Sequence, residues 1–301
     1  MEKIEEIEKL KFDKNIAIMA HNYQISAIQD IADFVGDSLE LAKKSREFEQ
    51  KTILVCGADF MAETAKILNP KKTVLNPRED NICPMAEMLD KNLILNAKKQ
   101  YPKASVVLYV NSTAEAKALA DCCCTSANAD KIVNKMKSDE ILFGPDKNLA
   151  WFVSRRSKKK IIPIPANGYC YVHRQITLEH VNEAKKLYPL AKLIAHPECN
   201  PEVQDAADAI ASTTGMINYA EMSKNAEFII ATEVGMVYRL NKELPNKKFY
   251  PVSENMICIQ QKKIGLNDVK LALDKERYEV KIPAATLKNA AKSIEKMIEL
   301  S

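Results

Sequence analysis

The sequence predicts an α/β fold of three similar α/β/α sandwich domains, each with a parallel sheet, related by pseudo-threefold symmetry around a central site. Two observations support this fold class. Short apolar runs rich in β-branched residues alternate with helix-period segments from end to end, and one set of motifs recurs about every 87 residues. Apolar runs without alternation are typical of parallel strands, because helices cover both faces of such sheets.

The first half of each repeat reads as a strand, a polar residue at the end of that strand, a helix, and a hydroxyl residue that opens the next helix. The polar residues are His21, Tyr109 and His196, spaced by 88 and 87 residues. A hydroxyl residue follows each of them after 17 residues: Ser38, Ser126 and Thr213. We therefore expect three equivalent units. The predicted strand cores are residues 16–20, 53–57, 105–110, 161–165 and 228–231.

The second half of each repeat contains a strand, a helix, a strand that runs into a proline, and a loop that reaches a cysteine. These cysteines, Cys83, Cys170 and Cys258, keep the same period, with separations of 87 and 88 residues. The period predicts domains at 1–87, 88–174 and 175–262. Residues 263–301 are expected to pack on the first domain or to begin a fourth unit that closes the ring. The alternative fold is an eight-stranded α/β barrel, whose repeat of one strand and one helix is much shorter than 87 residues.

The charge balance excludes some classes of partner. A net charge of +4 from 44 basic and 40 acidic residues predicts no nucleic acid and no membrane surface as a partner. No run reaches the roughly 18 apolar residues of a membrane span, and residues 1–11 form an amphipathic helix without the apolar core of a signal peptide. We expect a cytoplasmic protein whose eight cysteines are thiols or metal ligands rather than disulfides.

Ligands bind at the carboxyl ends of the strands in open parallel sheets, so three equivalent strand ends that face one axis would enclose one site. The three hydroxyl residues are expected to cap helix N-termini there. Converging helix N-termini would attract an anion through free N–H groups and positive dipole ends. The sequence therefore predicts a site for a substrate that carries carboxylate or phosphate.

The eight cysteines separate into two groups. Those expected to pack in the core are Cys56, Cys122, Cys123, Cys124 and Cys199. The adjacent three are expected near the end of a helix, where neighbouring side chains point about 100° apart and cannot share one ion. The three periodic cysteines would meet at the axis. Three thiolates there suit a [4Fe–4S] cluster with one iron left open as a Lewis acid; zinc is also possible, although the cysteine pairs of structural zinc sites are absent.

Several motifs together carry a family resemblance: AHNYQ (20–24), GDSLELA (36–42), YVNS (109–112), CCTSANA (123–129), AHPEC (195–199) and STTGM (212–216). With the three periodic cysteines, they make the chain resemble quinolinate synthases over essentially its full length. The resemblance implies a [4Fe–4S] cluster held by Cys83, Cys170 and Cys258. It also implies a transferase of de novo NAD biosynthesis, which condenses iminosuccinate (iminoaspartate) with dihydroxyacetone phosphate to quinolinate, with loss of phosphate and water.

The resemblance also implies roles for individual residues. Tyr23 would handle protons during isomerisation and cyclisation, and Glu198 with His196 and His21 would assist as acid and base. The substrate pocket would be lined by His21, Ser38, Tyr109, Val110, Asn111, Ser126, His196, Pro197, Glu198 and Thr213. An aspartate oxidase or an aspartate dehydrogenase would supply the iminosuccinate.

Two other functions fit the same residues. An iron–sulfur redox carrier or sensor would need neither a closed pocket nor His21 and Glu198. An iron–sulfur hydro-lyase that acts on another small polyanion would share the pocket but not the substrates. His173 and His180 match nothing in the other repeats and are expected to be surface or packing residues.

Overall fold

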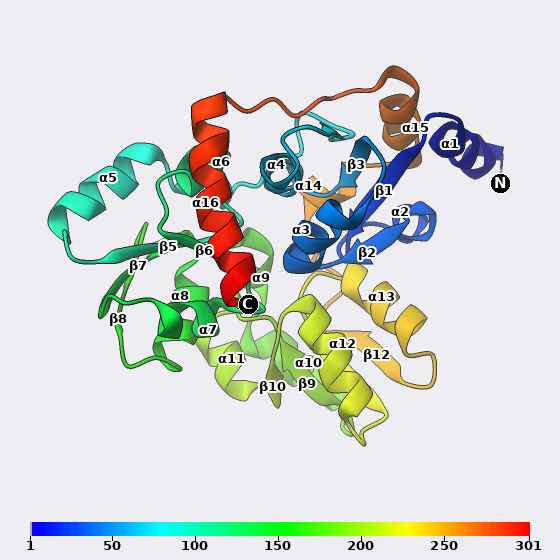
Figure 1. Cartoon of the computed structure of the whole chain (residues 1–301). Coiled ribbons are helices and arrows are strands. Elements are labelled where there is room, and N and C mark those ends of the chain that lie inside the picture. The colour runs from blue at the N-terminus through cyan, green and yellow to red at the C-terminus, as the bar shows by residue number, and fades with distance from the viewer. Residues whose placement is uncertain (1) are drawn as a thin grey trace.

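The computed structural model describes residues 2–301 and contains three four-stranded parallel sheets (Figure 1). All three have the same strand order, β2-β1-β3-β4, β6-β5-β7-β8 and β10-β9-β11-β12. The predicted α/β class with three similar units is confirmed, and we call these units the first, second and third repeat. The strands are β1 Ile16–His21, β2 Phe34–Gly36, β3 Thr52–Cys56, β4 Thr73–Leu75, β5 Ser105–Tyr109, β6 Cys122–Cys124, β7 Glu140–Gly144, β8 Lys160–Pro163, β9 Lys192–Ala195, β10 Ala209–Ile210, β11 Glu227–Ala231 and β12 Lys248–Pro251.

Helices connect the strands and cover the sheets. They are α1 Glu2–Asp13, α2 Ser26–Ile31, α3 Ser38–Glu47, α4 Asp59–Leu68, α5 Lys91–Gln100, α6 Ala114–Lys117, α7 Ala129–Lys135, α8 Lys147–Ser154, α9 Tyr171–Gln175, α10 Leu178–Leu187, α11 Pro201–Ala206, α12 Thr213–Met222, α13 Gly235–Glu243, α14 Ile259–Lys262, α15 Leu266–Lys275 and α16 Ala284–Leu300, with one 3₁₀ turn at Ala86–Met88. No helix among residues 2–301 is both long and apolar enough to cross a membrane.

The first sheet shows why its strands lack alternation. All six residues of β1 are buried, because side chains that point to opposite faces both meet helices. Ile16 and Ile18 pack in one cluster with residues of α1, α2 and α15, whereas Met19 packs on the other face with residues of α3 and α4. The second and third sheets are covered in the same way: α5 and α6 lie opposite α7 and α8, and α10 and α11 lie opposite α12 and α13.

The three repeats share one hydrogen bond from a backbone N–H to an aspartate carboxylate, which we call a backbone pin, as well as their strand order. Asp33, Asp121 and Asp208 each accept a hydrogen bond from an N–H of the neighbouring first strand, at 2.7 to 2.8 Å. These aspartates precede the three short edge strands β2, β6 and β10. Since a carboxylate that accepts from backbone N–H groups fixes the chain locally, each pin sets where the edge strand begins.

Those edge strands are where the structure departs from the prediction. β2, β6 and β10 have only three, three and two residues, and none was expected from the sequence. Cys122, Cys123 and Cys124 form β6 instead of the predicted helix end, and they are fully buried. Their expected packing role is therefore correct, but their predicted secondary structure is wrong.

Residues 263–301 divide between two repeats. Helix α15 packs on α1 and contacts β3 of the first repeat, and Glu279 bridges to Leu75 at the end of β4. Helix α16 crosses to contact α6 and β6 of the second repeat as well as α4 of the first (Figure 1). No fourth sheet forms among the described residues. The domain limits at 87, 174 and 262 stay predictions.

Candidate active site

One enclosed cavity lies where the three repeats meet. Its lining includes the strand-end residues His21 and Tyr109, together with His196, which directly follows β9. In all three sheets the strand order changes direction beside this first strand, which is the switch point where ligands bind in open parallel sheets. Other residues predicted for the site that line it are Tyr23, Ser38, Asn111, Ser126, Glu198, Thr213, Cys83, Cys170 and Cys258. Val110 and Pro197 are not among the lining residues.

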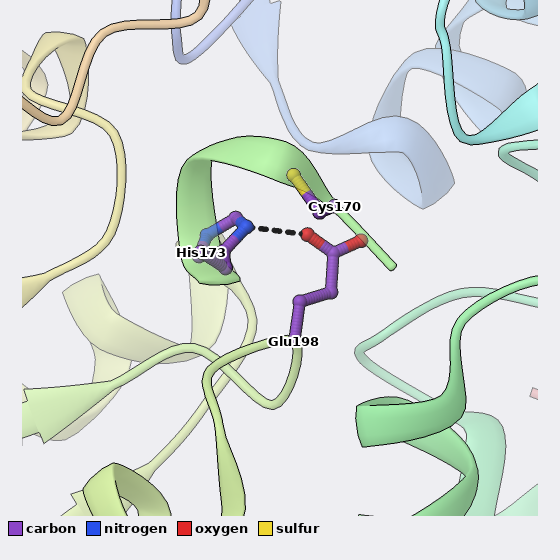
Figure 2. A group of neighbouring side chains, drawn as sticks. All are labelled: Cys170, His173 and Glu198. Carbon is purple, nitrogen blue, oxygen red and sulfur yellow. Dashed lines mark ion pairs between the residues drawn. The ribbon is translucent and has the colours of Figure 1, made fainter. Parts of the chain in front are cut away.

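Glu198 is a buried carboxylate in the lining of this cavity, with 3% of its surface exposed. Its Oε2 lies 2.7 Å from Nδ1 of His173 (Figure 2). It also lies 3.5 Å from Nδ1 of His196. Burial alone would raise the pKa of Glu198, but the two imidazoles outweigh burial and lower its pKa to about 2. The other oxygen, Oε1, has no hydrogen-bond partner among the described residues. A buried carboxylate oxygen without a partner is costly, so Oε1 is available to a bound ligand.

His173 was expected to be a surface or packing residue, and that expectation is wrong. It is 1% exposed, stacks on His196 with ring centroids 4.6 Å apart, and lines the cavity. Figure 2 shows its ring turned toward Glu198 from the short helix α9. The available signal was its position three residues after Cys170. His180, by contrast, is half-buried and lies in the capping box of α10.

Two hydrogen bonds and one close polar contact form a chain that links Tyr23 to Glu198 through Thr232 and His173. The hydroxyl groups of Tyr23 and Thr232 lie 2.6 Å apart, and the Thr232 hydroxyl lies 2.7 Å from Nε2 of His173. Which atom donates between the Thr232 hydroxyl and Nε2 of His173 depends on the ring nitrogen that carries the proton. Burial raises the pKa of Tyr23 well above its usual value, and the charge of Glu198 raises it further. The chain can therefore move a proton between two sides of the cavity without water. The sequence gave no signal for Thr232.

Both strand-end histidines are neutral in this environment. Burial lowers the pKa of His21 to about 3, and it lowers that of His196 to the same value with help from His173. Burial likewise raises the pKa of the Tyr109 hydroxyl, and Glu198 adds to this effect. The cavity thus holds the neutral rings of His21 and His196 and two phenols, together with the carboxyl groups of Glu198, Glu233 and Asp37.

The hydroxyl residues stand at helix N-termini, but they are not the caps that the sequence predicted. The N-cap of α3 is Asp37, which accepts from the N–H groups of Leu39 and Glu40 at 3.0 Å, and Ser38 is the first helical residue. The cap of α12 is Ser212, and Thr213 follows it.

Ser126 lies three positions before α7, whose N-cap is Asn128. Ser38 and Thr213 therefore lie beside a cap and Ser126 lies two residues before one, and all three line the cavity. Asp37 and Ser212 serve as the caps of α3 and α12, so the hydroxyls of Ser38 and Thr213 are not used as caps, and that of Thr213 accepts from Nδ2 of Asn22 at 2.8 Å.

The three periodic cysteines come from different repeats and line the same cavity. Burial raises the pKa of Cys83 to about 12, and the nearby Cys258 thiol raises it further. Burial also raises the pKa of Cys170, and Cys258 and Cys83 both contribute. Each repeat thus places one thiol on the lining of the same cavity. The other cysteines are fully buried and lie outside the lining: Cys56, Cys122, Cys123, Cys124 and Cys199.

Three convergent thiols are the donor set that iron–sulfur clusters prefer. Cys170, His173 and Glu198 also offer ligand atoms within 4.8 Å of one another (Figure 2). His173 and Glu198, however, already contact each other. The thiols fit a [4Fe–4S] cluster, and no fourth cysteine among residues 2–301 lines the cavity.

Comparisons with known proteins give one consistent family. Residues 5–299 match the family model described as quinolinate synthetase A protein. The chain is 56% identical over 298 residues to the quinolinate synthase of Thermococcus kodakarensis, and the match covers 99% of this chain and 98% of that one. It is 54% identical over 301 residues to that of Pyrococcus abyssi, over 100% of both chains. It is 47% identical over 297 residues to that of Thermotoga maritima, over 99% of each.

Proposed function

The chain belongs to the quinolinate synthase family, and from that membership we propose that it condenses iminosuccinate with dihydroxyacetone phosphate to quinolinate in NAD biosynthesis. Phosphate and water leave in the reaction. Both substrates are anions, and the observation that carries the proposal is one cavity that joins three thiols, a buried carboxylate and helix N-termini from all three repeats.

The anionic groups of the substrates would bind at the N-termini of α3 and α12. Ser38 and Thr213 are the first residues of these helices and line the cavity, whereas N–H groups of each first turn are already accepted by the caps Asp37 and Ser212. Ser126 and Asn111 complete the polar lining, and Oδ1 of Asn111 is buried without a hydrogen-bond partner among the described residues. A phosphate here would accept from hydroxyl and amide donors without a lysine or arginine.

Proton transfers would use Glu198 and Tyr23 at opposite ends of the Thr232–His173 chain. Glu198 is ionised and can accept a proton, while Tyr23 is protonated and can donate one. His196 and His21 are neutral, so either ring can accept or donate a hydrogen bond to a substrate imine or carbonyl. Condensation, isomerisation and cyclisation each need a proton removed at one atom and delivered at another, which suits such a connected pair.

Cys83, Cys170 and Cys258 would hold a [4Fe–4S] cluster. When bound, the cluster supplies a Lewis acid that assists the loss of water. The partner enzymes would be those that make iminosuccinate, an aspartate oxidase or an aspartate dehydrogenase. Because an imine hydrolyses readily in water, functional coupling to one of these enzymes would favour the reaction.

The test combines metal analysis with turnover. Anaerobically purified protein should contain about four irons and four sulfides per chain, and it should form quinolinate from the two substrates. Changing Cys83, Cys170 or Cys258 to alanine should abolish cluster assembly, because two thiolates hold a four-iron cluster poorly. The matched controls are Cys56→Ala and Cys199→Ala, which remove buried thiols outside the cavity and should keep the parent iron content.

Each outcome separates the alternatives. A protein with zinc and no sulfide would end the cluster assignment. A full cluster without quinolinate formation would instead favour the hydro-lyase on another polyanion. A cluster that transfers electrons and ignores both substrates would favour the redox carrier.

A further inference from the structure

Three carboxylates recur with the same period as the cysteines. Asp59, Asp146 and Glu233 are spaced by 87 residues, and each lies shortly after the central strand β3, β7 or β11. They precede the periodic cysteines by 24, 24 and 25 residues. Each begins or adjoins the helix that follows its strand, so the three occupy equivalent places beside the cavity.

Every one of these carboxylates accepts a hydrogen bond from the backbone N–H of the cysteine in its own repeat. The distances from nitrogen to oxygen are 3.0 Å for Cys83 and Asp59, 3.1 Å for Cys170 and Asp146, and 3.1 Å for Cys258 and Glu233. A backbone N–H could be satisfied by water or by a carbonyl group. Three equivalent carboxylates in this role indicate a shared constraint on the cysteine loops.

Two of the carboxylates use both oxygens. Asp146 accepts from Leu149 N, in the first turn of α8, at 2.6 Å while its other oxygen accepts from the cysteine. Glu233 likewise accepts from Gly235 N at 2.7 Å. Both residues are 0% exposed. Burying a carboxylate is costly unless its oxygens are hydrogen-bonded, and here the two N–H donors come from a helix and from a cysteine loop.

The second repeat shows how tightly loop and strand end are joined. Lys147 N donates to the carbonyl oxygen of Gly168, two residues before Cys170, at 2.9 Å. A Cβ atom at position 168 would lie only 1.9 Å from the carbonyl oxygen of Pro145. Only glycine permits this approach, so the loop is seated directly against the residues that flank Asp146.

We propose that Asp59, Asp146 and Glu233 are positioning residues that hold the three cysteine loops against the helix N-termini, so that the ligand cage is formed before metal arrives. The proposal rests on the proposed function, because it takes the cysteines as cluster ligands. Preorganised ligands lose less conformational freedom on binding, and residues that orient metal ligands affect metal affinity by about 10- to 100-fold. The carboxylates thus act on cluster retention through the backbone rather than through contact with the metal.

Asp59 and Asp146 allow a matched test. Asparagine caps a helix about as well as aspartate, but D146N can accept from only one of the two N–H groups, Leu149 N or Cys170 N, and turns its own NH2 group toward the other. Asp59 accepts only the cysteine N–H among its hydrogen bonds here, so D59N keeps that bond through its single oxygen, whereas D59A removes it. Glu233 also pairs with Lys262, and for that reason it is left out of the test.

The measurements are iron and sulfide per chain after anaerobic reconstitution, the rate of iron release to a chelator, and the melting temperature of the metal-free chain. We expect D146N and D59A to release iron roughly tenfold faster than the parent, and D59N to match the parent. The metal-free melting temperatures of D59A and D59N should agree, because residue 59 is only partly buried.

Parent-like iron content and release in D59A and D146N would overturn the proposal. If D146N does not fold, the comparison of D59A with D59N decides the matter alone, and equal release from these two would overturn it. A parent chain that holds no iron and sulfide would refute the proposed function instead, so the two failures are distinguishable.

Discussion

Removing the Ser38 hydroxyl should weaken substrate binding without weakening the fold. Ser38 is the first residue of α3, whereas Asp37 accepts the exposed N–H groups and forms a capping box with Glu40. A lost N-cap costs about 0.5 to 2 kcal/mol. We expect about 2 kcal/mol for D37A, because Asp37 accepts two N–H groups and also lies 3.3 Å from the Ser212 hydroxyl that donates to it. S38A should stay within about 0.5 kcal/mol of the parent.

These free energies convert into measurable shifts. The entropy of unfolding is about 2.1 cal/mol/K per residue, which gives about 0.6 kcal/mol per degree for 301 residues. D37A should therefore lower the melting temperature by about 3 °C, and S38A by less than about 1 °C. A hydrogen bond to a charged group contributes about 1.5 to 3 kcal/mol, so S38A should raise the KM for dihydroxyacetone phosphate by about tenfold or more.

The assay pairs thermal unfolding of the metal-free variants with quinolinate formation at varied triose phosphate. If the Ser38 hydroxyl binds the ligand and Asp37 caps the helix, S38A should change mainly KM and D37A should change mainly the melting temperature. If S38A melts as low as D37A and its KM equals that of the parent, Ser38 is a cap and the anion site is refuted.

Two further predictions concern the buried proton-carrying groups. His21 and His196 have a pKa of about 3 in the folded state and about 6.5 in the unfolded state. Their contribution to folding stability is therefore complete above pH 6.5 and is lost as the pH falls toward 3. Between pH 7.5 and 5.5 the unfolding free energy of the metal-free chain should fall by about 3 kcal/mol because of these two groups, and urea unfolding measures this fall. In H196Q the fall should be about half as large. A fall equal to that of the parent would contradict the assignment. T232V removes the hydroxyl between Tyr23 and His173 and should lower kcat by about 100-fold with little change in KM, whereas T232S should retain most of kcat; equal kcat in the two variants would show that the chain carries no proton.

Apolar patterning was sufficient to predict the central strands. Runs such as Ile16–His21 are buried on both faces, so an unbroken apolar run in the sequence indicates the strand directly. The edge strands are too short for this signal, since three cysteines or an Ala–Ile pair fit a strand or a helix equally well. What fixes them is the carboxylate pin before each strand, a contact between residues 15 apart in the chain.

The 87-residue period of the repeats predicted which residues would line one cavity, but it could not identify a site residue that occurs in one repeat only. The strand-end residues and the periodic cysteines line one cavity because equivalent positions face one axis. His173 has no counterpart in the other repeats, so a search for equivalence passed over it. The predicted N-caps of α3 and α12 are wrong by one residue, because two residues that can cap a helix are adjacent there: Asp37 with Ser38, and Ser212 with Thr213. Only the extended backbone at Asp37 and Ser212 decides between them.

The threefold arrangement within one chain has a consequence for how the site could diversify. In a trimer of identical subunits, any substitution at a strand end would appear three times around the axis. Here each position changes alone, and the three strand ends carry histidine, tyrosine and histidine. The backbone pins, in contrast, are aspartate in every copy. Covalent fusion of the repeats therefore lets the framework remain symmetric while two unlike ligands meet different side chains on each side.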